Sequence, residues 1–310
     1  MKILIVGYYT EDTVSRIREV FPREWEVTAV RPGEEKDHIQ DTDILIPEHI
    51  KVDEELLGRA ARLKLVQTGA GYDNVDIEAC TRHGVKAANA AGVNADAVAE
   101  HTFAMILGYY KNLPFLDAFM KQRRDEKQLY YNGAELKGRT IGIIGLGAIG
   151  RRVAAYCDSM GIRVLGYDPF VKECADYITL SSLEELLKAS DIITVHVYLN
   201  EETRHMFSRE TFEKMKNTAL LVNTARGGIV CQEDLIEALK TGQIGGACLD
   251  VFEEEPLPVE SELRDLPNVI LTPHTAGMPD GLKFHKTRYE FFRRNIEAVM
   301  EGKEVESKLN

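Results

Sequence analysis

Apolar and polar positions alternate along the first hundred residues with two different periods. Short apolar runs that are typical of buried strands occur at KILIV, WEVTAV, DILIP and LKLVQTGA. Between them lie runs with helical spacing, such as TEDTVSRIREVF and DEELLGRAA. Strands that alternate with helices predict a parallel sheet with helices on its faces.

A long, largely apolar helical run, VAEHTFAMILGYYKNLPFLDAFMK, covers residues 98–121 and is interrupted at Pro114. A helix this apolar has to be buried between layers or against another subunit. At roughly 100–200 residues per domain, the length of the chain predicts two domains. Because the chain has no low-complexity linker, we expect the boundary near residue 98, in a helix rather than in a flexible tether.

A second alternating series begins at residue 139. Its six strand-like runs are RTIGIIGLG, RVLGYDP, DIITVHV, ALLVNTA, GGACLDV and VILTPH, with helical runs between most of them. This pattern predicts the α/β class and a complete Rossmann-type, doubly wound parallel sheet. A charged amphipathic helical run after residue 279 ends the chain.

The charge and the cysteines narrow the function classes. Lys and Arg number 38 and Asp and Glu 50, so the net charge is 38 − 50 = −12, which disfavours nucleic acid and an anionic membrane surface as partners. The five cysteines are scattered without a CxxC, so we expect no disulfide framework, no thiolate metal site and a reducing compartment.

The start, MKILIVGYY, is typical of a strand rather than a signal peptide. No run approaches the ~18 apolar residues of a membrane span, and we predict a cytoplasmic protein.

A glycine motif, Gly145-x-Gly147-x-x-Gly150, joins the strand-like TIGII to the helical AIGRRVAAYC. In this context it indicates a dinucleotide site, because the N–H groups and positive dipole of the helix start favour phosphate. The next strand-like run ends at Asp168, 168 − 150 = 18 residues after Gly150. A carboxylate there can accept hydrogen bonds from both ribose hydroxyls and would repel a 2′-phosphate. We therefore predict NAD (NADH) as the cofactor, with NADP less favoured, although Lys172 would soften the repulsion.

Charged and polar side chains follow four strands of the second series. They are His196, Arg226, Asp250, Glu255 and His274. The carboxyl ends of parallel strands meet at one edge, where such sheets bind ligands, so we expect these side chains to lie together. Each alone has an ordinary structural explanation, but together they suit hydride transfer to a carbonyl. Arg226 would hold a carboxylate and polarise the ketone. His274 would protonate the alkoxide, with its pKa raised and its ring fixed by Glu255.

Four segments, ELKGRTIGIIGLGAIGRRVA, LVNTARGGIV, CLDVFEEEPLP and NVILTPHTAG, resemble the signature segments of the D-isomer-specific 2-hydroxyacid dehydrogenases, in the family's order. The resemblance covers about residues 60–280. It implies NAD(H)-dependent reduction of a small 2-keto acid to the D-2-hydroxy acid, and the reverse. It also implies that Arg226, Glu255 and His274 are the catalytic residues.

The same resemblance implies a domain organisation. A smaller flavodoxin-like substrate domain would consist of residues 1–98 and 281–310, and a dinucleotide-binding domain of residues 99–280. A homodimer would form through the helices around residues 99–135.

The resemblance further implies ligand contacts. TGAGYDNVD (68–76) is similar to the family's carboxylate-binding loop, so the backbone N–H groups of Ala70 and Gly71 would bind the substrate carboxylate, with Arg226 and His274 as further substrate contacts. NAAGVNADAVAEHT resembles the family's interdomain segment beside the nicotinamide, with Val98 as a contact. The other expected cofactor contacts are Gly145, Gly147, Ala148, Ile149, Gly150, Asp168, His196, Val197, Thr203, Thr224, Ala225, Asp250, Ala276 and Gly277.

Some positions depart from the family pattern. Tyr198 and Ala91 stand where proline is common. Phosphoglycerate enzymes carry basic residues in the loop that here reads LIPEHIKV, with Glu48 and His49, and an acid there would repel a phosphate, so 3-phosphoglycerate ranks low. A phosphoglycerate or glyoxylate/hydroxypyruvate specialist is still an alternative. An NAD-sensing, corepressor-like interaction protein is an alternative of another class. The chain shows no appended interaction tail, which favours a metabolic enzyme.

Overall fold

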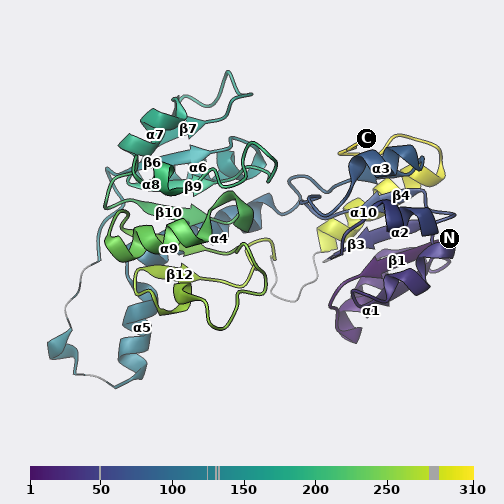
Figure 1. Ribbon diagram of the computed structural model, residues 1–310, viewed down its shortest axis with the longest axis horizontal. Helices are drawn as coiled ribbons and strands as arrows, with labels where there is room; N and C mark the ends of the chain where they lie inside the picture. The colour runs from purple at the N-terminus through teal and green to yellow at the C-terminus, as the bar shows by residue number, and fades with distance from the viewer. Residues whose placement is uncertain (49, 124, 130, 132, 279–285) are drawn as a thin grey trace. The chain divides into compact units, whose positions relative to one another are not determined.

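The computed structural model describes residues 1–310 except 49, 124, 130, 132 and 279–285. The chain divides into two compact units, Met1–Asn94 with Met278–Asn310, and Ala95–Gly277 (Figure 1). The division lies before the helix that starts at Ala95, whereas we expected it near residue 98, within that helix. The assignment of the two units to substrate and dinucleotide stays a prediction.

The first unit contains a five-stranded parallel sheet of order β2-β1-β3-β4-β5. Its strands are β1 (Lys2–Val6), β2 (Glu26–Val30), β3 (Ile44–Pro47), β4 (Leu65–Gln67) and β5 (Lys86–Ala88). Its helices are α1 (Glu11–Val20), α2 (Glu54–Arg59), α3 (Ile77–Arg82) and α10 (Lys286–Met300). This flavodoxin-like order confirms the predicted α/β class.

The two faces of this sheet follow the alternation of side chains along each strand. Leu4 and Val6 pack in a cluster with residues of α2 and α3. Ile3 and Ile5 pack in another cluster with residues of α1 and α10. The sequence pattern did not predict β5, because three residues with small side chains carry too little of a strand signal.

The second unit contains a seven-stranded parallel sheet of order β12-β11-β10-β9-β6-β7-β8. Its strands are β6 (Thr140–Ile144), β7 (Arg163–Tyr167), β8 (Ile178–Leu180), β9 (Ile192–Val195), β10 (Leu220–Asn223), β11 (Gly246–Leu249) and β12 (Val269–Leu271). Its helices are α4 (Ala95–Tyr110), α5 (Leu113–Lys121), α6 (Ala148–Ser159), α7 (Leu183–Ala189), α8 (Arg209–Phe212) and α9 (Gln232–Thr241). We expected six strands; the seventh, β8, is a three-residue edge strand with two exposed residues.

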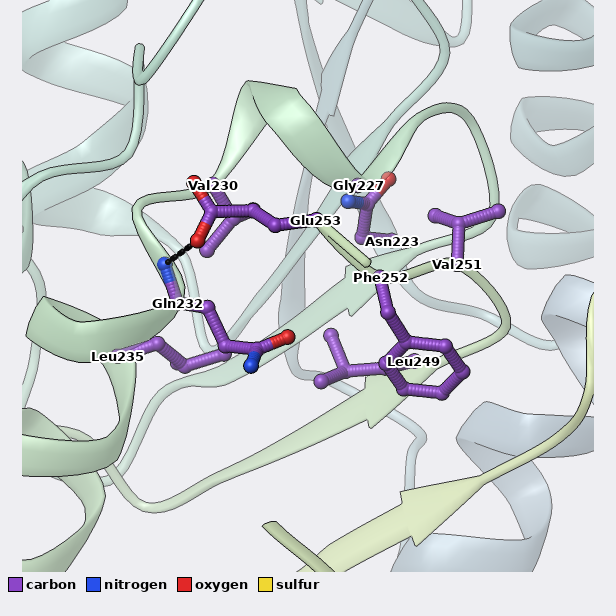
Figure 2. Close-up of a pocket in the computed structure, with 9 residues that line it drawn as sticks. All are labelled: Asn223, Gly227, Val230, Gln232, Leu235, Leu249, Val251, Phe252 and Glu253. Atoms are coloured by element: carbon purple, nitrogen blue, oxygen red, sulfur yellow. Dashed lines mark hydrogen bonds between the residues drawn. The ribbon is translucent and has the colours of Figure 1, made fainter. Parts of the chain in front are cut away.

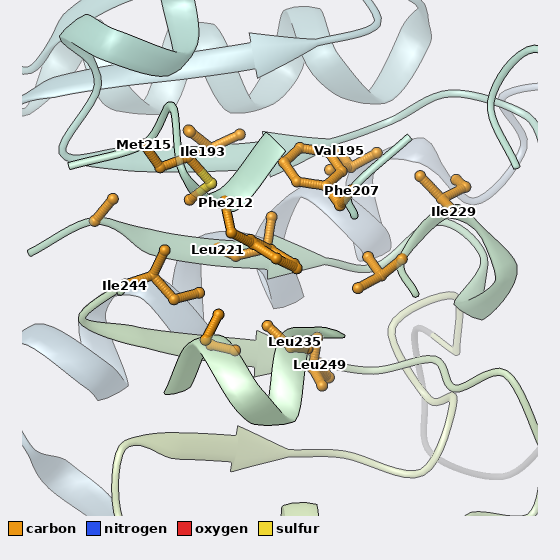
Figure 3. Close-up of a cluster of buried hydrophobic side chains, with 14 of the residues drawn as sticks. Ile193, Val195, Phe207, Phe212, Met215, Leu221, Ile229, Leu235, Ile244 and Leu249 are labelled. Atoms are coloured by element: carbon orange, nitrogen blue, oxygen red, sulfur yellow. The ribbon is translucent and has the colours of Figure 1, made fainter. Parts of the chain in front are cut away.

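Helices cover both faces of this sheet, as a doubly wound fold requires. On one face, residues of α7, α8 and α9 pack against the strands, with Phe212 and Leu235 among them (Figure 3). On the other face, α4 and α6 contribute residues such as Ile106 and Val153. Strand order reverses between β9 and β7, on either side of β6, so the topology predicts a dinucleotide site at the ends of these strands.

The long apolar run does not form one helix. Asn112, between α4 and α5, adopts a left-handed conformation with φ 52°. Pro114 lies in the first turn of α5, where a missing N–H breaks no helical hydrogen bond. The expected interruption at Pro114 is therefore corrected: Asn112 makes the turn and the proline starts the next helix. No helix in the described part of the chain is long and apolar enough to cross a membrane.

Candidate active site

His274 and Glu255 form a close pair on loops that follow β12 and β11. His274 Nδ1 lies 2.6 Å from Glu255 Oε2, and Glu255 Oε1 accepts a hydrogen bond from the Phe252 N–H at 3.0 Å. The hydrogen bond to Glu255 raises the pKa of His274 above its usual value, against the effect of burial. Burial alone would raise the pKa of Glu255, but the hydrogen bond and charge of His274 lower it overall. No described residue forms a hydrogen bond with His274 Nε2, so this nitrogen is available for proton transfer.

Arg226 follows β10 and acts electrostatically on both members of this pair. Its charge lowers the pKa values of Glu255 and His274. The backbone of Arg226 is extended, with φ −146° and ψ 139°. Gly227 and Gly228 follow Arg226, and neither has a positive φ. Gly227 is needed for a close approach instead, since an added Cβ would lie 1.8 Å from the carbonyl oxygen of Phe252.

Asp250 fixes the loop that carries His274. Its fully buried carboxylate accepts hydrogen bonds from Thr272 Oγ1 at 2.6 Å and from the N–H groups of Thr275 and Ala276, both at 2.9 Å. Its backbone carbonyl accepts a bond from the His274 N–H at 2.8 Å. Asp250 therefore holds the histidine loop through four hydrogen bonds. Its contact with the cofactor stays a prediction.

Two residues of α4 that the sequence analysis missed join this region. His101 Nε2 lies 3.0 Å from Thr272 Oγ1 and 3.7 Å from Asp250 Oδ1. Thr102 Oγ1 lies 2.9 Å from Thr224 Oγ1, after β10. The signal that could have identified them is a pair of polar residues in an otherwise apolar helical run.

The glycine motif forms the turn between β6 and α6. Gly145 has φ 94°, and an added Cβ would lie 2.5 Å from the carbonyl oxygen of His196. Gly150 packs so closely that a Cβ would lie 2.0 Å from the carbonyl oxygen of Gly145. At Gly147, by contrast, nothing lies within 4 Å of an added Cβ. Ala148 and Ile149 start α6, whose first N–H groups have no partner within the helix. This cradle fits the phosphates of a dinucleotide.

Asp168, at the end of β7, is bonded to the glycine turn. Its Oδ2 accepts from the Leu146 N–H and its Oδ1 from the Phe170 N–H, each at 2.9 Å. Phe170 is 88% exposed and was not among the residues expected from the sequence. An exposed aromatic ring two residues after the acid is a flat apolar surface beside the expected ribose position.

His196 and Val197 follow β9 and lie against the glycine turn. Burial lowers the pKa of His196 to about 3, so its imidazole is neutral. Its Nε2 lies 3.0 Å from Thr194 Oγ1, while its buried Nδ1 has no hydrogen-bond partner among the described residues. A buried polar atom beside the glycine turn fits a site that binds a polar ligand.

Other expected cofactor contacts have clear places in the second unit. Val98 is buried in α4. Thr203 closes its own loop by donating to the carbonyl oxygen of Tyr198 at 2.6 Å. Ala225 directly precedes Arg226, and Ala276 and Gly277 follow His274. Their contacts with a cofactor stay predictions.

In the first unit, the expected carboxylate loop follows β4. The carbonyl oxygens of Gly69 and Ala70 accept bonds from the Ala90 N–H and from Asn89 Nδ2, both at 2.9 Å. No described residue accepts a hydrogen bond from the N–H of Ala70 or Gly71. These two N–H groups are therefore available to an anionic ligand.

Glu48, which we expected to repel a phosphate, is paired with a cation in the structure, and its effect on a phosphate stays a prediction. Its Oε1 forms an ion pair with Arg288 Nη2 at 2.8 Å. His49, named with it, lies outside the described residues.

A small pocket lies beside the Arg226 loop, lined by Asn223, Gly227, Val230, Gln232, Leu235, Leu249, Val251, Phe252 and Glu253 (Figure 2). Glu253 accepts a hydrogen bond from the Gln232 N–H at 3.2 Å there. His274, Glu255 and Arg226 are not among the residues that line this pocket, so we do not assign the reaction to it.

The second unit thus carries two sets of groups along one edge of its sheet. His274, Glu255 and Arg226 follow β12, β11 and β10, while the glycine turn and Asp168 follow β6 and β7. At roughly 4.8 Å per strand, the three steps from β10 to β7 separate the strand ends that carry Arg226 and Asp168 by about 14 Å. An extended dinucleotide suits this arrangement, with its reactive end at the charged set and its ribose end at Asp168.

Comparison with known proteins agrees with this geometry. The family model described as "D-isomer specific 2-hydroxyacid dehydrogenase, NAD binding domain" matches residues 103–276. The chain is 37% identical over 317 residues to a D-3-phosphoglycerate dehydrogenase of Methanocaldococcus jannaschii, covering 100% of this chain and 59% of the relative. It is also 37% identical over 320 residues to a glyoxylate reductase of Thermococcus litoralis, covering 97% and 94%.

Solved structures share the fold. A D-lactate dehydrogenase of Aquifex aeolicus, solved with NAD and lactic acid, is similar with a TM-score of 0.84 and 31% identity, covering 97% of this chain and 96% of that one. The D-3-phosphoglycerate dehydrogenases are longer, and the chain spans 43–59% of the length of four of them.

Proposed function

The chain belongs to the D-isomer-specific 2-hydroxyacid dehydrogenases, and from this premise we propose that it reduces a small 2-keto acid to the D-2-hydroxy acid with NADH, and catalyses the reverse. One observation carries the proposal. His274 and Glu255 lie 2.6 Å apart, Arg226 acts electrostatically on both, and all three follow strands of a sheet whose glycine turn fits a dinucleotide.

Each residue of the proposed site has a different role in the reaction. When bound, NADH supplies the hydride that forms the new C–H bond at the keto carbon and is itself oxidised. The guanidinium of Arg226 binds the substrate carboxylate and polarises the ketone, and the N–H groups of Ala70 and Gly71 bind the same carboxylate. The carbonyl π electrons move to oxygen, which takes a proton from His274 Nε2 and leaves a neutral imidazole. Glu255 stabilises the imidazolium and fixes the ring before transfer.

The cofactor contacts follow the same proposal. The phosphates would lie on the N–H groups of Gly147, Ala148 and Ile149. Asp168 would bind the ribose hydroxyls and disfavour NADP. The further proposed contacts are Val98, Gly145, Gly150, His196, Val197, Thr203, Thr224, Ala225, Asp250, Ala276 and Gly277.

We also propose a homodimer in the cytoplasm. On α5, Leu113, Phe115 and Met120 are 54%, 45% and 53% exposed, and apolar side chains of this size on one short helix favour burial in an interface. The five cysteines are all free thiols, which suits a reducing compartment. Sedimentation analysis tests the dimer, and Leu113→Asp with Met120→Asp should yield a monomer.

The activity is tested by following NADH oxidation with glyoxylate, pyruvate, hydroxypyruvate and phosphohydroxypyruvate. We expect turnover with at least one acid and the D-isomer as the product. His274→Gln should lower kcat by roughly 10²–10⁴-fold while NADH binding persists. Tight NADH binding without turnover of any acid would contradict the enzyme proposal and favour an NAD-sensing role.

A further inference from the structure

The first unit carries a charged cluster that none of the proposed catalytic steps uses. We define the Glu48 cluster as Tyr9, Glu48, Arg288 and Tyr289. Arg288 Nη2 lies 2.8 Å from Glu48 Oε1, and the two side chains are only 22% and 24% exposed. Tyr289 Oη lies 3.4 Å from Arg288 Nη2 and 3.4 Å from Tyr9 Oη. The guanidinium also lies 5.2 Å from the centre of the Tyr289 ring. The guanidinium donors, the carboxylate acceptor and the two tyrosine hydroxyls thus lie in one compact group.

The backbone places this cluster at the point where the strand order of the first sheet reverses. β2 pairs with one side of β1, and the chain then crosses over to β3, which pairs with the other side. Tyr9 follows β1, and Glu48 follows β3, where its N–H donates to the Val6 carbonyl at 2.8 Å. Ligands of open α/β sheets bind outside the carboxyl ends of the strands at such a point. The topology therefore predicts a ligand where the cluster lies.

A glycine lets the Tyr9 ring fold back over the end of β1. A Cβ on Gly7 would lie 2.6 Å from the Tyr9 ring. Any other residue at this position would push the ring away.

Arg288 also lies beside the proposed carboxylate loop. A Cβ on Gly69 would lie 3.6 Å from Arg288 Nη1, and Gly69 directly precedes Ala70 and Gly71. A keto acid whose carboxylate is bound by those two N–H groups would bring its own substituent within a few ångströms of the guanidinium. The cluster and the loop are therefore close enough to contact one substrate.

The charges of the cluster decide what kind of substituent it accepts. The formal charges of Arg288 and Glu48 cancel. Burial is the main cause that raises the pKa of Tyr9 well above its usual value, and the Glu48 carboxylate raises it further, so the Tyr9 hydroxyl stays neutral. A hydroxyl or carboxamide can accept from the guanidinium and donate to the carboxylate without separating them. A carboxylate or phosphate would face the like charge of Glu48, and a methyl group would desolvate both ions without replacing a hydrogen bond.

We propose that the Glu48 cluster binds the substituent of the 2-keto acid and selects an uncharged hydrogen-bonding group, a hydroxyl or a carboxamide, over methyl, carboxylate or phosphate. This inference rests on the proposed reduction of 2-keto acids. It assigns Arg288 and Glu48 to substrate specificity.

The test measures kcat/KM with NADH for hydroxypyruvate, pyruvate, oxaloacetate and phosphohydroxypyruvate. The wild-type protein should prefer hydroxypyruvate to pyruvate by about tenfold or more, as expected for a hydrogen bond to a charged group. Glu48→Gln keeps the shape and leaves the charge of Arg288 unbalanced. Oxaloacetate should therefore improve relative to hydroxypyruvate by about tenfold. Arg288→Met should abolish the preference for hydroxypyruvate over pyruvate.

A matched control lies in the same helix. Arg293 is an exposed arginine of α10 that pairs with Glu297 at 2.8 Å, so Arg293→Met should leave every substrate ratio unchanged. Arg288→Met leaves a partly buried acid unpaired and is expected to destabilise the fold. The near-isosteric Glu48→Gln is therefore the variant that decides whether the proposed substituent site is correct.

The outcomes separate the two proposals. If the wild-type protein reduces keto acids but Glu48→Gln leaves the oxaloacetate ratio unchanged, the substituent site is wrong and the proposed activity stands. If the wild-type protein binds NADH but reduces neither these four acids nor glyoxylate, both proposals are wrong.

Discussion

Replacing Glu255 by Gln tests how much the acid contributes to proton transfer. The amide oxygen of the variant can still accept the hydrogen bond from His274 Nδ1, so the substitution removes the charge and keeps the shape. A hydrogen bond between charged groups contributes about 1.5–3 kcal/mol. The His274 and Glu255 side chains are 48% and 33% exposed, so solvent screening reduces this to about 1–2 kcal/mol. At 1.4 kcal/mol per tenfold change in rate, kcat/KM for reduction near neutral pH should fall about 5- to 30-fold.

The pH dependence gives the sign of the effect. Reduction requires the imidazolium, and Glu255 raises the pKa of His274, so the rate falls as the pH rises through that pKa. In Glu255→Gln this decline should begin at lower pH. Oxidation requires the neutral imidazole, so oxidation by the variant should persist to lower pH than in the wild-type protein. The assay is a pair of kcat/KM profiles against pH, one for each direction.

The chain contains a nearly identical pair that serves as the control. His205 Nε2 lies 2.6 Å from Glu253 Oε1, with side chains 47% and 34% exposed. This pair matches the His274–Glu255 pair in distance and exposure but includes none of the proposed reacting groups. Glu253→Gln should leave both profiles in place. An unshifted profile in Glu255→Gln, or an equal shift in Glu253→Gln, would refute the assignment of His274 as the proton donor.

Four further substitutions test the remaining parts of the site. Gly147→Ala should leave the thermal unfolding temperature unchanged, because nothing lies within 4 Å of the new Cβ, but it should weaken NADH binding in a fluorescence titration. Gly145 has φ 94°, so Gly145→Ala should instead destabilise the fold by about 1–3 kcal/mol. Asp168→Ala should raise kcat/KM with NADPH relative to NADH, and an unchanged ratio would mean that this acid does not contact the ribose. Asp250→Asn replaces one acceptor oxygen by an amide that faces the loop N–H groups, so kcat should fall at least about tenfold in the NADH-oxidation assay.

The fold was predictable where the hydrophobic pattern extends over whole elements. β6 and α6 were identified because a buried strand, three spaced glycines and an amphipathic helix follow one another. β5 and β8 were not identified, because each has three residues and owes its place to pairing with a neighbouring strand. Pro114 misled the helix assignment, since a proline suits the start of a helix as well as a break within one.

The site was predictable in its residue types but not in its supporting contacts. Parallel strands bring their carboxyl ends to one edge, so residues after β10, β11 and β12 could be expected together. His101 and Thr272 are 171 positions apart, and Glu48 and Arg288 are separated by 288 − 48 = 240. Nothing in the local pattern of either partner specifies the other. The sequence also did not reveal why residue 227 has to be a glycine, because the reason is the close approach of Gly227 to the backbone of Phe252 and not its own dihedral angles.

The backbone of His274 explains why so many bonds of Asp250 are directed at one loop. His274 has φ 53°, a left-handed conformation that costs a non-glycine residue about 1–2 kcal/mol. The carboxylate of Asp250 bonds Thr272, Thr275 and Ala276 on both sides of that residue, and His101 lies against the same threonine. At about 1 kcal/mol each, these bonds are sufficient to offset the cost and keep the imidazole against Glu255. The histidine therefore acts from a position that its own backbone does not favour, and Asp250 is the residue that maintains it.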